Sequence, residues 1–506
     1  MTDIPGSMSR PAGCRPAARR AALVAAIYLG TFIATLDISI VNVALPTLQT
    51  ALGTDLAGLQ WVVDSYALCL SAFMLSAGPV GDRWGRKRCW LGGVGLFTIG
   101  SALCAAASDL PLLLVGRVVQ GIAGAALIPG AMSILTQAFP DPARRAHVIG
   151  VWSSFSAAAL ITGPILGGIL VDTAGWPSIF LINLPLGVAA VALGAWGIEE
   201  TAHPDHAALD PLGQGLSVLA LGSLTFGLIA AGEGGWTASP AAPALVLGLA
   251  GLGAFLWVEA RVGRPILPLA LFRDRGFAAV NAASFALGFS AYASVFFVSL
   301  FLQRAQGWPP AATGWGMAPQ FLPMAAVSVL FGRLAARRSA HRLMLLGYAL
   351  IGIGMLGLGF VSAGTPYAAV AALLVVLGGG MGLAIPATGA AMMATAPRER
   401  TGMASATMNA LRQMGMTIGI ALLGTLMGAR ATGLLAAVLG QAGAADPQAL
   451  AAAAVTRHDM AGLGEGGAAL LAQAFAGGFN LAMVLAGAVA LLAAILLAML
   501  RPRCPG

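Results

Sequence analysis

Four charged residues stand inside long apolar runs of the sequence: Asp37, Asp64, Arg117 and Arg412. A charge at the centre of a membrane helix costs roughly 2.5–3.5 kcal/mol on insertion scales, so such residues usually mark an ion or substrate pathway. Two carboxylates beside one guanidinium leave one carboxylate without a counter-charge, and burial favours the protonated form of that group. The pattern therefore predicts a proton-binding site made by Asp37, Asp64 and Arg117.

The positions of these three residues along their runs place them at similar depth. At a rise of about 1.5 Å per residue, Asp37 lies roughly 13 Å before Pro46, where its run ends. Asp64 and Arg117 each lie roughly 10 Å after the start of their runs. Two simpler interpretations stay open: Asp64 is hydrated near the membrane surface, or Asp37 is a structural ion-pair partner without a role in proton transfer.

Other polar or aromatic side chains inside the apolar runs are candidates for orienting an amphiphilic substrate. They are Asn42, Gln120, Asn183, Asn281, Tyr292, Gln320, Asn409, Arg412 and Gln413. Each of them is equally suited to a hydrogen bond between helices.

The composition identifies the elements that must position these residues. Of 506 residues, 58% are hydrophobic and 9% are charged, whereas roughly 25% are charged in a soluble domain. A helix needs about 20 apolar residues to cross a bilayer. The predicted spans are 21–45, 57–79, 89–107, 110–138, 147–171, 177–197, 211–232, 241–259, 277–302, 312–334, 343–362, 366–394, 402–428 and 472–500. We therefore expect an all-α integral membrane protein with fourteen transmembrane helices, and a short surface helix within the loop 429–471.

The distribution of basic residues predicts the orientation. Of the 27 Lys and Arg residues, 22 fall in the tails and in the loops on the side of the N-terminus. Only Arg304, Arg430 and Arg457 fall on the opposite side. Because positively charged loops stay in the cytoplasm, both termini are predicted to be cytoplasmic. The loop after 177–197 is an exception, since it carries Glu199 and Glu200 but no Lys or Arg.

Several classes of function are excluded or disfavoured. The net charge of +8 is explained by the basic loops, so no nucleic-acid partner is predicted. The only lysine, Lys87, follows Arg86, so no phosphate-binding loop for ATP exists. The cysteines form no C-x-x-C pair, and the histidines form no H-E-x-x-H motif. We expect no metal, no cofactor and no enzymatic activity.

Two glycine-containing motifs indicate moving helices. After the second span, Gly78, Asp82, Arg83, Gly85, Arg86 and Lys87 place one acid among bases at a tight turn, where charge pairing can lock helices in one state. On the fifth span, Gly163, Pro164, Gly167 and Gly168 place small residues on one face, allowing close backbone approach. This second motif predicts a packing hinge.

Together these residues resemble the major facilitator superfamily, and within it the fourteen-span drug:proton antiporter branch. The residues from Gly78 to Lys87 resemble motif A, and the run from Leu114 to Gly121 resembles motif B, whose arginine is implicated in proton coupling. The glycines and proline from Gly163 to Gly168 resemble motif C, which is associated with antiporters. The runs 36–46, 60–66 and 179–187 are similar to signatures of the branch. Two departures stand out: Trp176-Pro177-Ser178 lacks a second tryptophan, and 332–338 lacks the acid of motif A.

The resemblance implies two six-helix bundles with two linker helices. The expected divisions are a tail at 1–20, an N-terminal bundle at 21–197, a linker at 198–276, a C-terminal bundle at 277–500 and a tail at 501–506. It also implies alternating access to a site between the bundles.

We therefore predict a monomeric transporter of the bacterial cytoplasmic membrane, whose partners are the lipid bilayer, protons and a small-molecule substrate. It would exchange protons for a drug, an antibiotic or another amphiphile. The alternatives are an exporter of one endogenous metabolite or self-made antibiotic, and a uniporter or importer.

Overall fold

The computed structural model describes residues 17–202, 210–237, 239–263, 265–267, 269–395, 401–464 and 466–499. Most of the predicted N-terminal tail, the predicted C-terminal tail and the histidines at 203 and 206 lie outside these ranges. Throughout the described residues the regular elements are all helical. This confirms the all-α class.

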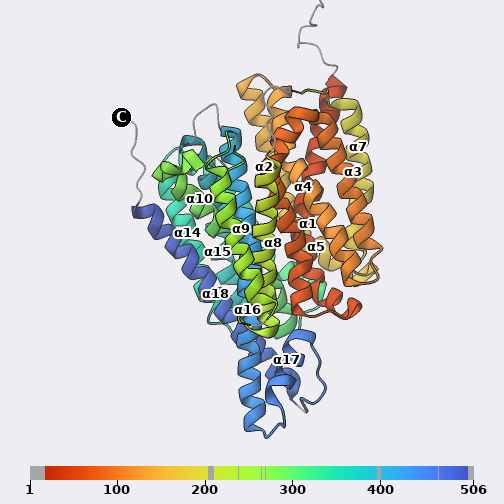
Figure 1. The fold of residues 1–506 in the computed structure, drawn as a ribbon, viewed down its shortest axis with the longest axis vertical. Helices are drawn as coiled ribbons and strands as arrows, with labels where there is room; N and C mark the ends of the chain where they lie inside the picture. The colour runs from red at the N-terminus through yellow and green to blue at the C-terminus, as the bar shows by residue number, and fades with distance from the viewer. Residues whose placement is uncertain are drawn as a thin grey trace, which may run out of the picture.

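The chain from residue 17 to residue 197 forms seven helices (Figure 1). They are α1 (Ala17–Leu52), α2 (Leu56–Trp84), α3 (Arg86–Ala105), α4 (Leu110–Ala138), α5 (Pro142–Ala174), α6 (Ser178–Leu181) and α7 (Asn183–Gly197). The short α6 and the longer α7 follow each other as one membrane span, Ser178–Gly197. We call α1–α7 the N-terminal bundle.

Two helices, α8 (Pro211–Gly234) and α9 (Ala241–Glu259), form the linker pair. A short 3₁₀ turn, η2 (Leu269–Arg273), leads into the C-terminal bundle. That bundle comprises α10 (Arg275–Leu287), η3 (Gly288–Tyr292), α11 (Ser294–Leu300), η4 (Phe301–Ala305), α12 (Pro310–Gly316), α13 (Ala318–Ala335), α14 (Ala340–Leu358), α15 (Tyr367–Thr395), α16 (Thr401–Gln441), α17 (Pro447–Arg457) and α18 (Gly467–Met499).

Fourteen helical segments among the described residues are long and apolar enough to cross a membrane. Their ends agree with the predicted spans to within about five residues, with two larger differences. Helix α1 runs to Leu52, whereas its predicted span ends at 45. Helix α16 runs to Gln441, whereas its predicted span ends at 428. The short helix expected within 429–471 is α17, and it packs against α16 and α18 in a small apolar cluster. Whether α17 lies on a membrane surface stays a prediction.

Aspartate side chains begin many of these helices. Asp55, Asp109, Asp141, Asp210, Asp274 and Asp446 each accept a hydrogen bond from the backbone N–H three residues further on. An N-cap of this kind satisfies one of the free N–H groups at a helix start. Much of the acidic content of the chain therefore serves to end loops and to begin spans.

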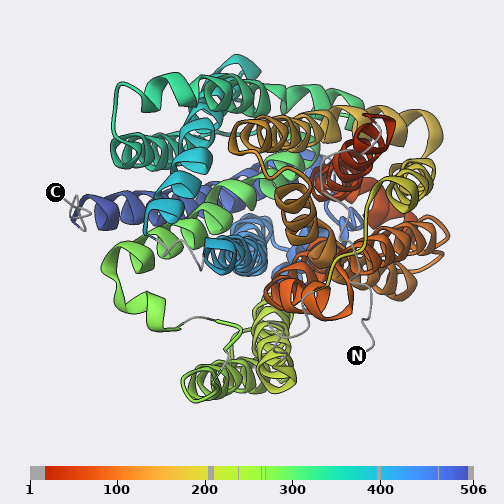
Figure 2. The same cartoon turned by 90° about the horizontal axis from the view of Figure 1, so that it is seen from above.

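The two bundles stand side by side, with the linker pair at one edge (Figure 2). Helix α8 contacts both bundles. Gln214 donates to the Ala72 carbonyl of α2 at 3.0 Å, and Thr425 of α16 donates to the Leu228 carbonyl at 2.7 Å. The residue boundaries predicted for the bundles and linker stay a prediction.

We call the end of the molecule that carries the start of α1 the proximal end, and the opposite end the distal end. The turn between α1 and α2 lies at the distal end, as does α17, which projects beyond the other helices beside the extension of α16 (Figure 1). Fourteen is an even number of crossings, so α1 begins and α18 ends on the same side.

Candidate functional site

A buried ion pair joins α1 to α4 in the N-terminal bundle. The guanidinium of Arg117 pairs with the carboxylate of Asp37, and both side chains are almost fully buried. Arg117 also donates to the Val62 carbonyl of α2 at 2.9 Å and lies over the ring of Tyr66, 4.5 Å from its centre. Three helices are thereby tied to one guanidinium. The prediction that Asp37 and Arg117 lie in one layer agrees with this geometry.

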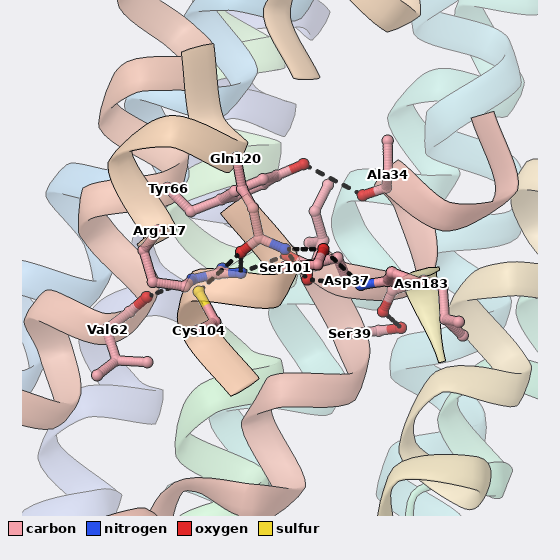
Figure 3. A network of polar contacts seen from close by, with 12 residues as sticks. Ala34, Asp37, Ser39, Val62, Tyr66, Ser101, Cys104, Arg117, Gln120 and Asn183 are labelled. Atoms are coloured by element: carbon pink, nitrogen blue, oxygen red, sulfur yellow. Dashed lines mark hydrogen bonds and ion pairs between the residues drawn. The ribbon is translucent and has the colours of Figure 1, made fainter. Parts of the chain in front are cut away.

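Three uncharged side chains complete the surroundings of Asp37 (Figure 3). Gln120 donates to Asp37 Oδ1 at 3.0 Å and accepts from Arg117 at 2.8 Å. Asn183 donates to the same carboxylate oxygen at 3.5 Å. Ser101 accepts from both amides, at 2.8 Å from Gln120 and 3.2 Å from Asn183. This network fixes the orientation of the Asp37 carboxylate between α1, α4 and α7.

Asp64 stands apart from this network. Its side chain is fully buried, and neither carboxylate oxygen has a hydrogen-bond partner in the structure. An ionised carboxylate without partners in a dry interior costs several kcal/mol, and such a group takes up a proton instead. The expectation that all three charges meet holds for Asp37 and Arg117 only. Arg117 contacts α2 through the Val62 carbonyl and not through Asp64.

The face of α2 that carries Asp64 packs on the C-terminal bundle. Gln60, one helical turn earlier, donates to the Ile420 and Ala421 carbonyls of α16 at 2.9 and 3.1 Å. Leu68, one turn later, belongs to an apolar cluster that includes Met414 of α16. Residues four apart share one face of a helix. Asp64 thus lies on the surface of α2 that meets the opposite bundle.

A pocket lies between the two bundles. Its walls are Ile38, Ser39, Asn42, Val63 and Leu160 from the N-terminal bundle, and Tyr292, Val295, Phe321, Met381, Met416 and Ile420 from the C-terminal bundle. Its mostly apolar walls with a few polar groups are typical of sites for small organic molecules, but in this closed state its volume is only about 20 Å³. Val63, the residue before Asp64 in the sequence, is the wall residue that α2 contributes.

The structure distributes the predicted substrate-binding residues over three places. Asn42 and Tyr292 line the pocket, and Arg412 lies over the ring of Tyr292 while donating to Asn409 at 2.6 Å. Gln320 donates to Ser294 Oγ at 3.4 Å and to the sulfur of Met381 at 3.7 Å.

The others lie away from the pocket walls. Gln120 and Asn183 hold Asp37. Asn281 donates to the Phe277 carbonyl of its own helix at 2.9 Å, and Gln413 is buried, with its carbonyl accepting from Thr417. Roles in substrate binding stay a prediction for all nine residues.

The residues of motif A form a charged turn at the proximal end. Asp82 and Arg86 form an ion pair at 2.8 Å across the break between α2 and α3. Gly85 stands at that break with φ of +103°, where a side chain is strained. Lys87 donates through its ammonium to the Ala195 carbonyl at 2.6 Å. For Gly78 and Arg83 the structure gives no comparable contact that would assign a role.

The acidic loop that broke the pattern of basic residues packs on this turn. The Glu200 carboxylate accepts from the backbone N–H groups of Lys87 and Arg88, both at 3.1 Å, at the start of α3 where negative charge is favoured. A Cβ on Gly85 would lie 2.6 Å from the Glu200 carboxyl carbon. The acidic loop thus caps the start of α3 beside the basic turn, at the same end of the molecule. This contact accounts for acids in place of bases in the loop.

The glycines of motif C bring α5 against two other helices. A Cβ on Gly167 would lie 2.9 Å from the Ile40 carbonyl of α1. One on Gly168 would lie 2.8 Å from the Ala311 Cα of α12. Gly163 faces Ser39 of α1, and the Pro164 carbonyl abuts Gly314 of α12. Motif C therefore packs on α1 of its own bundle with one face of α5, and on α12 of the other bundle with the adjacent face.

Hydrogen bonds between the bundles lie in the distal half of the helices. Ser299 donates to the Asn42 carbonyl at 2.8 Å, and Gln303 donates to the Val43 carbonyl at 3.1 Å. Asp172 accepts from the Ala311 N–H at 3.0 Å.

Two further contacts involve Gln49 at the distal end of α1. Gln49 donates to the Thr456 carbonyl at 2.8 Å and accepts from Arg304. Together with the bonds of Gln60 to α16, these contacts hold the two bundles together in their distal halves. The structure is therefore closed between the bundles at the distal end.

Sequence reasoning missed Ser101, because a serine in a span is common and gives no signal. Gln60 and Tyr66 were included only as part of the run 60–66, and their contacts with α16 and Arg117 were not predicted. Gln120 was expected in the substrate cavity, whereas its place three residues after Arg117 predicts a face shared with that residue.

A helical membrane protein with two bundles, closed at one end around a central pocket, has the architecture of a membrane transporter. The sequence pattern of the Major Facilitator Superfamily matches residues 27–419 and again 280–457. The chain belongs to this superfamily, and it is a multi-pass membrane transporter.

Named relatives support this assignment. Multidrug resistance protein Stp of Mycobacterium tuberculosis (strain CDC 1551 / Oshkosh) is 36% identical over 401 residues, covering 79% of this chain and 74% of that protein. The methylenomycin A resistance protein of Bacillus subtilis (strain 168) is 35% identical, covering 80% and 87%. The tetracenomycin C resistance and export protein of Streptomyces glaucescens is 30% identical, covering 93% and 89%.

A solved structure supports the fold. The crystal structure of a bacterial homolog to the human lysosomal transporter Spinster, in an inward-facing and unoccupied conformation, has a TM-score of 0.65 with this chain. The two chains are 20% identical, and the match covers 96% of this chain and 97% of the other.

Proposed function

We propose that this protein exports a drug, an antibiotic or another small amphiphile across the bacterial cytoplasmic membrane in exchange for protons. Both termini and the proximal end face the cytoplasm, as the basic loops predict. The protein acts as a monomer, uses no cofactor and draws its energy from the proton gradient. The names of the relatives support drug or antibiotic export, and the observation that carries proton exchange is the unpaired, fully buried carboxyl of Asp64.

In this mechanism Asp64 is the residue that gains and loses the proton. Asp37 is held by contacts with Arg117, Gln120 and Asn183. Asp64 has none of these partners, so it can be buried against α16 only in its protonated form. The pair Asp37–Arg117 accordingly positions α2 through the Val62 carbonyl, while Asp64 carries the proton.

Protonation of Asp64 is thereby linked to the state of the distal end. When the distal end opens, α2 leaves α16 and the carboxyl meets water, where it exchanges its proton with the outside. Uptake of a proton permits closure and gives the state described here. Substrate that enters the pocket beside Val63 favours loss of the proton to the cytoplasm. The charged carboxylate then opposes the closed interface, and the distal end opens to release the substrate.

The energy is sufficient for useful export. One proton entering across a potential of about 100 mV releases about 2.3 kcal/mol. Coupled one to one, this sustains roughly a 50-fold gradient of a neutral compound.

Transport in inside-out membrane vesicles tests the proposal. With the vesicle interior made acidic, inside-out vesicles that contain the overproduced chain should accumulate ethidium, methylenomycin A or tetracenomycin C, and an uncoupler should abolish the accumulation. Uptake of only one compound in a broad panel would favour the alternative of a dedicated exporter. Uptake of the compounds at equal rates with and without the pH gradient would contradict proton exchange and favour a uniporter.

A further inference from the structure

A second hollow lies outside the central pocket, at the distal end between α2 and the linker pair. This lateral groove has a volume of about 460 Å³. The side chains of Trp61, Leu110, Phe226 and Ile229 supply its apolar walls. Trp61 of α2 and Phe226 of α8 form an aromatic pair with ring centres 6.2 Å apart. The groove thus has one aromatic wall near the ends of spans, the depth at which tryptophan usually marks the boundary between lipid tails and headgroups.

Two opposite charges line the same groove. Asp55 at the start of α2 and Arg457 at the end of α17 both border it. The Asp55 carboxylate accepts from the Gly58 N–H at 2.8 Å, and Arg457 makes no hydrogen bond or ion pair with any residue that the structure describes. Asp55 likewise has no ion pair within the described ranges. A groove with separated, unpaired charges of both signs is complementary to a zwitterion.

We propose that this lateral groove binds one phospholipid with an ethanolamine headgroup. The phosphate pairs with the Arg457 guanidinium, the ammonium pairs with the Asp55 carboxylate, and an acyl chain lies along the aromatic wall. An anionic glycerol headgroup offers hydroxyl donors but no positive charge to Asp55, and its net negative charge is repelled by that carboxylate. A choline headgroup has no N–H donors and is bulkier, so it cannot hydrogen-bond to the carboxylate.

The location gives this lipid a consequence for the cycle. Asp55 belongs to the N-terminal bundle, whereas Arg457 follows Thr456, whose carbonyl receives the hydrogen bond from Gln49. A headgroup that contacts both charges therefore bridges the two bundles beside the distal closure. Bound lipid stabilises the distal-closed state, independently of which compound the protein exports.

Native mass spectrometry of the full chain tests the proposal. Purified protein is mixed with equal amounts of dioleoyl phosphatidylethanolamine, phosphatidylglycerol and phosphatidylcholine. We expect the ethanolamine lipid to be retained about fivefold more than the other two, the size of one exposed ion pair. Equal retention of the three lipids would assign the groove to bulk lipid and overturn the proposal.

Two variants and one control locate the binding. Asp55→Asn keeps a good helix cap while removing the charge, and it should abolish the discrimination against phosphatidylglycerol. Arg457→Gln should lower retention of the ethanolamine lipid by about fivefold. Arg430→Gln removes another exposed arginine of the distal half and should change nothing. Unchanged retention in both groove variants would contradict the site, and the preference of the unmodified chain decides the matter if a variant does not fold.

Discussion

Asp64 lies one helical turn beyond Gln60 on α2, so an acid without a partner directly follows the amide that holds α2 to α16. This spacing joins a group that can change its charge to a contact that must break when the bundles separate. A change of charge at Asp64 therefore acts beside the Gln60 hydrogen bonds that hold α2 to α16.

Replacing Asp64 by asparagine should hold the protein in the state that it adopts when Asp64 is protonated. Asn cannot ionise, so Asp64→Asn should fold, keep the distal end closed and lose accumulation driven by a pH gradient. Exchange of labelled for unlabelled substrate, which needs no net proton movement, should be retained in part. The measurement compares both activities in the same proteoliposomes.

Asp109→Asn is the matched control for this change. Asp109 caps α4 through the Leu112 N–H at 2.9 Å, and Asn is an equally good cap. Its transport should equal that of the unmodified chain. Full accumulation by Asp64→Asn would remove Asp64 from the mechanism.

Breaking the Asp37–Arg117 pair should affect stability. Asp37→Ala leaves a buried guanidinium with only Gln120 and a backbone carbonyl as partners, and loss of one member of a buried pair costs about 3–5 kcal/mol. We expect a large fall in the thermal unfolding midpoint in detergent.

The double variant Asp37→Leu with Arg117→Met separates stability from transport. With both charges replaced by apolar groups of similar size, much of the stability should return. Transport should stay impaired, because α2 loses the bond from Arg117 to the Val62 carbonyl. A single variant as stable as the unmodified chain would show that Asp37 is not held as the structure indicates.

The sequence predicted the spans well because lipid imposes a length and an apolar composition on each one. Helix α4, for example, has the ends predicted for it. The partner of Arg117 was not predictable, since depth along a helix says nothing of the direction in which a side chain points. The contact of Gln60 with α16 was also out of reach. It depends on which faces of the two bundles meet, and that changes during transport.

Gly424 should be needed for the closed distal end. A Cβ at this position would lie 2.9 Å from the Gln60 amide carbon, so Gly424→Ala should displace the amide that bonds to α16. Loss of the two hydrogen bonds should shift the population toward the distal-open state.

Distances between spin labels at Thr50 and Gln441, both exposed, report this shift in a background without the native cysteines. We expect a longer component to grow in Gly424→Ala. A distance distribution identical to that of the unmodified chain would mean that the Gln60 contact does not control closure.

The close approach of α5 to α12 should be needed for efficient transport. Gly168→Ala places a methyl group 2.8 Å from the Ala311 Cα, and backbone atoms of two packed helices cannot move aside as a flexible side chain can. Distal closure should weaken, and accumulation should fall severalfold while the protein remains folded. Gly95→Ala is the control, because it adds the same methyl group to a membrane helix at a position with open space around it. Equal initial rates of pH-driven uptake for the two alanine variants would show that motif C does not act through contact with α12, since the two changes differ only in that contact.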